Sequence, residues 1–101
     1  MMALAEGNER RICEAAGVSA VLAAMDAHPK HAGMQLLGVA ALMNLASDKD
    51  NSHLIAMCSG VEAILAAMQN HPTHVGLQLL GCGALRRLAI ITSNQEKIAK
   101  A

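Results

Sequence analysis

The chain has 101 residues, of which 53% are hydrophobic and 16% charged, a composition typical of one small domain with a packed core. Eight basic and eight acidic residues cancel, so no overall field attracts phosphate backbones or anionic lipid. No Phe, Tyr or Trp is present, which removes the stacking platforms of single-strand binders. We therefore expect no nucleic-acid partner.

Polar residues interrupt every apolar stretch well before the roughly 18 to 20 residues that cross a bilayer, so we expect no membrane segment. The amino terminus lacks a basic region followed by a sustained apolar run, so it does not resemble a secretory signal. Both observations favour a cytoplasmic or nuclear protein. Cys13, Cys58 and Cys82 are an odd set without CxxC spacing, which predicts reduced thiols in or near the core.

The sequence repeats itself with a period of 43 residues. Residues 8–50 align with residues 51–93 without gaps, and 21 of the 43 aligned positions are identical by direct count. Residues 1–7 match the tail of a preceding repeat, and residues 94–101 match the first helix of an incomplete third. Repeats of this length predict stacked units of supersecondary structure, which form one domain over residues 1–101.

Each repeat is predicted to contain three helices. Asn8, Asn51 and Asn94 are expected to cap a short first helix. Gly17 and Gly60 are expected to end that helix in the left-handed conformation.

A second and a third helix follow in each repeat. The second helix has apolar residues at i, i+3, i+4 and i+7, namely Val18, Val21, Leu22 and Met25, and then Val61, Ile64, Leu65 and Met68. The third and longest helix is expected to begin at about Pro29 and Pro72. Its apolar positions are Met34, Leu37, Ala41, Leu42 and Leu45, and then Leu77, Leu80, Ala84, Leu85 and Leu88.

Gly38 and Gly81 occupy equivalent positions inside the third helices, where glycine costs on the order of 1 kcal/mol relative to alanine. We expect a close approach of a neighbouring helix at both positions. Neutral drift after duplication is the alternative.

A short helix, a glycine, a GV-x-x-(V/I)-L helix and a long helix ending ALMNLA or ALRRLA together resemble the armadillo repeat over essentially the whole chain. The resemblance implies an all-α fold, a right-handed α-solenoid of three-helix repeats. It also implies a protein-interaction scaffold that binds a peptide or protein segment on the concave face lined by the third helices. HEAT repeats are the alternative solenoid, but the short first helix and the glycine after it favour armadillo.

The resemblance also implies positions for partner binding. Asn44 stands where armadillo proteins commonly hydrogen-bond a peptide backbone, and Arg87 holds that position in the second repeat. Ala40 and Gly83 occupy the position of the tryptophan that usually precedes it.

Two other polar residues, Arg86 and Asp48, are candidates for the same concave face, where they could pair with an acidic or backbone-presenting partner. A solvated helix face is the alternative for these polar groups.

Four histidines recur as pairs in HPKH and HPTH, namely His28, His31, His71 and His74. They are weak candidates for metal binding. Equivalent histidines should lie roughly 10 Å apart, one helix-packing distance, so we expect them to cap the third helix or shield the turn. No catalytic motif is present, and we expect neither enzyme activity nor a cofactor.

A repeat cannot bury its apolar surface alone, and terminal units normally carry a polar outer face. No such capping is visible here, so self-association through the repeat ends is expected, with a symmetric dimer as the commonest closed outcome. The alternative to a binding scaffold is therefore a structural or self-assembling repeat fragment, natural or engineered.

Overall fold

The computed structural model describes the backbone of residues 2–100 and the side chains of residues 15–90. Five helices account for nearly all of this range, namely α1 (Met2–Ala27), α2 (Ala32–Leu45), α3 (Lys49–Met57), α4 (Gly60–Asn70) and α5 (Val75–Lys100). No strand occurs within the described backbone, so the expected all-α class is confirmed.

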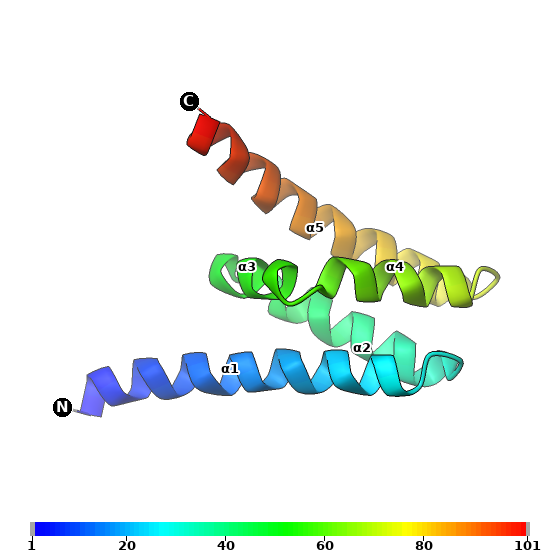
Figure 1. The fold of residues 1–101 in the computed structure, drawn as a ribbon, viewed down its shortest axis with the longest axis horizontal. Helices are drawn as coiled ribbons and strands as arrows, with labels where there is room; N and C mark the ends of the chain where they lie inside the picture. Colours follow the sequence, from blue (N-terminus) through cyan, green and yellow to red (C-terminus); the bar gives the residue numbers. More distant parts are fainter. Residues whose placement is uncertain (1, 101) are drawn as a thin grey trace.

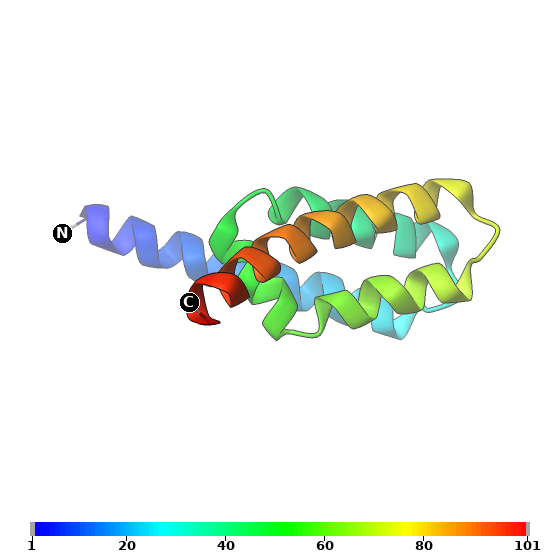
Figure 2. The same ribbon diagram turned by 90° about the horizontal axis from the view of Figure 1, so that it is seen from above.

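The helices form two stacked layers (Figures 1 and 2). The first layer is the hairpin of α1 and α2, and the second is the hairpin of α4 and α5. α2 packs against α5 and α1 packs against α4, while α3 connects the layers at the end opposite the two hairpin turns. The resulting body measures 49 × 35 × 17 Å.

The core follows the apolar positions shared by the two repeats. Its fully buried members within the described side chains include Val18, Val39, Leu42, Ile55, Ile64 and Leu77. Leu37 and Leu65 are exceptions to the predicted stripes, because they are 71% and 41% exposed.

The first repeat does not break at Gly17, and this part of the prediction is wrong. α1 runs without interruption through that glycine, whereas the second repeat breaks between α3 and α4, which are bent by 71°. The left-handed residue at the break is Ser59, with φ 66°, and no described glycine has positive φ. The equivalent residue in the first repeat is Ala16, a stronger helix former than serine, which favours continuation of the helix.

The expected helix starts are also shifted. Asp48 caps α3, because its Oδ1 accepts the backbone N–H of Asp50 at 2.8 Å, so Asn51 lies inside the helix. Asn8 lies within α1 and Asn94 within α5. The third helices begin at Ala32 and Val75, three residues after the prolines.

The expected close approach at Gly38 and Gly81 is confirmed. A β-carbon on Gly38 would come within 2.5 Å of Met25 Cγ, and one on Gly81 within 2.5 Å of Met68 Sδ. Real Cβ atoms essentially never come so close to another atom. Each glycine therefore makes room for the methionine of the preceding helix.

The described helices include no single helix that is both long and apolar enough to cross a membrane. Only α3 and α4 taken together reach that apolar length, and the 71° bend separates them.

Candidate partner-binding face

Asn44 and Arg87 lie near each other on the α2 and α5 side of the molecule. Asn44 is exposed in the last turn of α2, and Arg87 is exposed on α5. Arg87 Nη1 donates a hydrogen bond of 2.9 Å to the Met43 carbonyl oxygen. Arg87 thus reaches back across the repeat boundary to the residue that precedes Asn44.

The contact of Arg87 completes the capping of α2. The last four carbonyl groups of a helix lack partners inside it. The carbonyl oxygens of three neighbouring residues accept backbone N–H groups from the following turn, namely Leu42, Asn44 and Leu45. Arg87 satisfies the remaining Met43 carbonyl and brings a positive charge to the negative end of the helix dipole.

Ala40 and Gly83 are both partly buried, and Gly83 lies against α2. A β-carbon on Gly83 would lie 3.3 Å from Met43 Sδ, so the small residue at this position lets α5 approach α2. Arg86 is exposed. Asp48 is engaged in capping α3, so its carboxylate is already used by the fold.

The four histidines occupy the hairpin turns. His31 Nδ1 accepts the Met34 N–H at 3.0 Å, and His74 Nδ1 accepts the Leu77 N–H at 3.0 Å. The prediction that histidines cap the third helices is therefore confirmed for these two. His71 differs, because its Nε2 donates to the Pro29 carbonyl oxygen at 2.9 Å and joins the two turns.

The described residues contain no group of three or more His, Cys, Asp or Glu side chains placed to hold a metal ion. Cys58 and Cys82 are exposed, so their expected place in or near the core is wrong. Cys13 lies outside the described side chains.

Two glutamines that the sequence analysis did not single out close the hairpins. Gln35 Nε2 donates to the carbonyl oxygens of Met25 and His28, both at 2.8 Å. Gln78 repeats this pattern with Met68 at 2.9 Å and His71 at 3.0 Å. The available signal was an identical polar residue inside the apolar stretches MQLLG and LQLLG.

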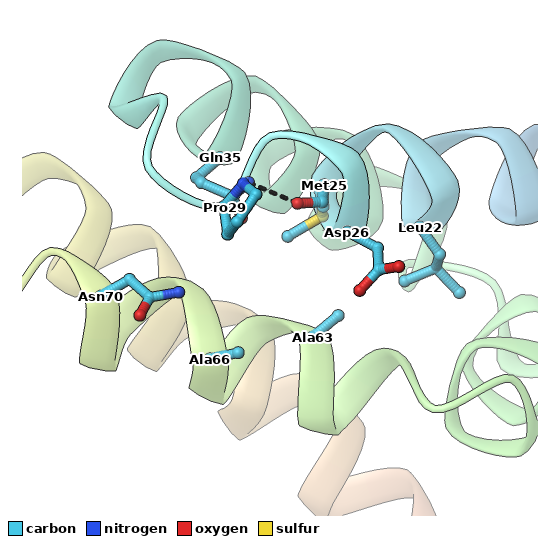
Figure 3. A pocket seen from close by; sticks show the side chains of 8 residues that line it. All are labelled: Leu22, Met25, Asp26, Pro29, Gln35, Ala63, Ala66 and Asn70. Atoms are coloured by element: carbon cyan, nitrogen blue, oxygen red, sulfur yellow. Dashed lines mark hydrogen bonds between the residues drawn. The ribbon is translucent and has the colours of Figure 1, made fainter.

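A cavity of about 90 Å³ lies between the layers, next to the turn from α1 to α2 (Figure 3). Leu22, Asp26 and Pro29 line it from the first layer, and Ala63, Ala66 and Asn70 line it from α4. This volume is well below the roughly 300 to 1,000 Å³ of small-molecule sites.

Comparisons with protein-family models, with curated proteins and with solved structures gave no match.

Proposed function

We propose that this chain is a non-enzymatic protein-interaction scaffold, built as a right-handed α-solenoid of armadillo-type repeats. Its partner-binding face is the side formed by α2 and α5, and its partner is an extended peptide or protein segment. The proposal extends the resemblance of the ALMNLA and ALRRLA helices to function.

The observation that supports the proposal is the hydrogen bond from Arg87 to the Met43 carbonyl. It joins α5 to α2 next to the exposed Asn44, which is the equivalent of Arg87 in the first repeat. The Asn44 amide can both donate to and accept from a peptide backbone. The Arg86 guanidinium, one residue before Arg87, can bind a carboxylate with two parallel hydrogen bonds. The preferred segment is therefore extended and carries at least one acidic side chain.

A peptide library selected against the full chain tests this proposal. Affinity is measured by fluorescence polarisation with a labelled peptide. We expect Asn44→Ala and Arg86→Ala each to weaken binding about tenfold, the equivalent of roughly 1.4 kcal/mol.

Glu62→Ala, which removes an exposed charge from α4, is the matched control and should leave affinity unchanged. Binding that survives Asn44→Ala and Arg86→Ala but is lost in Glu62→Ala would contradict the proposed face.

A second candidate function is self-assembly through the repeat ends. Val75 and Leu79 favour it, because both lie on α5 and both are 69% exposed. Apolar side chains grouped on one helix face commonly mark a surface that another protein covers.

A further inference from the structure

The two layers are copies of one unit, so the burial of each position in one layer can be compared with the position 43 residues later. Val39 is completely buried, whereas the equivalent Cys82 is exposed. Leu36 is partly buried, whereas the equivalent Leu79 is 69% exposed. The difference arises because the second layer covers the first, while the described structure places nothing over the second.

Other positions show the reverse difference, with greater burial in the second layer than in the first. They identify the surface at the N-terminal end. Leu80 is partly buried and packed against the core, whereas the equivalent Leu37 is 71% exposed. Ile64 is completely buried, whereas Val21 is only partly buried. These positions of the second layer are covered because the first layer precedes them.

The internal interface shows how such ends fit together. Larger side chains of the first layer, Leu22, Leu36 and Met43, lie against small residues of the second. Leu22 and Ala63 line the same end of the cavity from opposite layers (Figure 3). A β-carbon on Gly76 would lie 3.8 Å from Leu36 Cδ1, and one on Gly83 would lie 3.3 Å from Met43 Sδ.

The same two surfaces are left uncovered by the described residues. We define the C-terminal open face as the apolar equivalents of the larger side chains and their neighbours, namely Leu65, Val75, Leu79 and Cys82. We define the N-terminal open face as the equivalents of the small residues and their neighbours, namely Ala20, Ala23, Gly33, Leu37 and Ala40. One face carries protruding side chains and the other carries mostly alanine and glycine.

We propose that a second copy of this chain docks its N-terminal open face on the C-terminal open face of the first, in the geometry that joins the two layers internally. The proposal rests on the second candidate function, self-assembly through the repeat ends. The two faces are different and complementary, so the contact is heterologous and adds further copies head to tail. The symmetric dimer expected from the sequence would instead pair each face with itself.

One polar contact is available in this arrangement. His71 donates to the Pro29 carbonyl inside the molecule, and the equivalent pair at the ends is His28 of one copy and Pro72 of the preceding copy. His28→Ala should weaken association about threefold to tenfold, the range of one ordinary hydrogen bond.

Two matched leucine variants test the docking mode. Leu79→Glu places a charge on the C-terminal open face and Leu37→Glu places one on the N-terminal open face. Both side chains are about 70% exposed (69% and 71%), so the helical fold should survive, as checked by circular dichroism. Ile90→Glu is the control, because residue 90 is 51% exposed and the equivalent Ser47 is exposed as well.

Sedimentation velocity over a concentration series is the measurement. The unmodified chain and Ile90→Glu should form species that grow with concentration, while each leucine variant alone should associate at least tenfold more weakly. A one-to-one mixture of the two leucine variants should form dimers that do not grow further, because one unmodified face of each kind remains to pair.

Three outcomes would overturn the proposal. An unmodified chain that stays monomeric at every concentration would remove self-assembly as a function. If the unmodified chain associates but the mixture forms no dimers, head-to-tail docking is refuted, whereas self-assembly as a function is not. Association equally weakened by Ile90→Glu would show that the two open faces are not involved.

Discussion

Gly17 and Gly60 occupy the same position of the repeat, yet replacing each with alanine should change stability in opposite directions. A β-carbon on Gly17 would meet no atom within 4 Å, and the residue lies inside the continuous helix α1. Alanine is better than glycine by about 1 kcal/mol inside a helix. Gly17→Ala should therefore raise the free energy of unfolding by about that amount.

Gly60 stands at the corner between α3 and α4. A β-carbon there would come 2.7 Å from the Ile55 carbonyl oxygen and would also collide with Ile55 Cγ2. Ile55 is completely buried, so it has little space to move. Overpacking of this kind costs about 1 to 3 kcal/mol, which exceeds the gain in helix propensity, and Gly60→Ala should lower stability by about 1 kcal/mol or more.

Urea unfolding followed by circular dichroism at the helix band measures both variants, because the chain has no tryptophan or tyrosine fluorescence. The dependence of the unfolding free energy on urea should be the same for both variants and the parent. Loss of stability in Gly17→Ala would contradict a continuous α1 with open space at Gly17, since alanine is disfavoured where glycine is left-handed or where a β-carbon would collide with a neighbour. Equal effects of the two substitutions would refute the different roles assigned to the two repeats.

Three further substitutions test local contacts, each by the same urea unfolding. Gln35→Ala should lower the free energy of unfolding by about 2 kcal/mol, because two carbonyl groups lose a buried donor. Gln78→Ala is the comparison and should cost less, since Gln78 is only partly buried. An unchanged stability of Gln35→Ala would contradict the hairpin contact. His31→Ala should lower the free energy of unfolding by about 1 kcal/mol, because the N-cap of α2 is lost. His31→Asn should retain most of the stability, because asparagine can also cap a helix. Equal losses in these two variants would argue against capping. Ser59→Gly should raise stability by about 1 kcal/mol, because glycine adopts the left-handed conformation without the steric cost of a side chain; a loss of stability would contradict the φ of 66° at this residue.

The repeat pattern predicted the helical class and most of the core. Val18, Met25 and Leu42 were expected on buried helix faces and are 3% exposed or less. Apolar periodicity predicts these positions well because the side that faces a neighbouring helix is determined by spacing alone. Leu37 and Leu79 also belong to apolar stretches, but their burial depends on a neighbouring layer and not on spacing within the helix.

Helix breaks were predicted less well, because a break depends on residues around the glycine as much as on the glycine. Alanines precede Gly17, and they favour continuation of α1. Cys58 and Ser59 precede Gly60. In this repeat the Asp48 cap starts α3 as a separate helix, and the buried Ile55 fixes α3 against the core. The sequence motif is nearly the same in both repeats, and its surroundings decide the outcome.

The candidate face could be predicted only as a set of exposed polar positions. Arg87 was chosen because it replaces the asparagine of the other repeat, but its contact with the Met43 carbonyl depends on the distance between α2 and α5. Gln35 was not chosen, since a single polar residue among apolar ones does not indicate which carbonyl groups it will reach. Contacts between layers are set by three-dimensional packing, which a single sequence does not specify.

The hydrogen bonds that close the two hairpins affect how the chain folds. Gln35 reaches the Met25 carbonyl ten residues away, and Gln78 reaches the Met68 carbonyl over the same separation. Proteins rich in such local contacts fold within microseconds to milliseconds, because little chain entropy is lost before contacts form. Each hairpin can therefore form early and serve as a surface on which the other completes, so folding can start from either end of the chain.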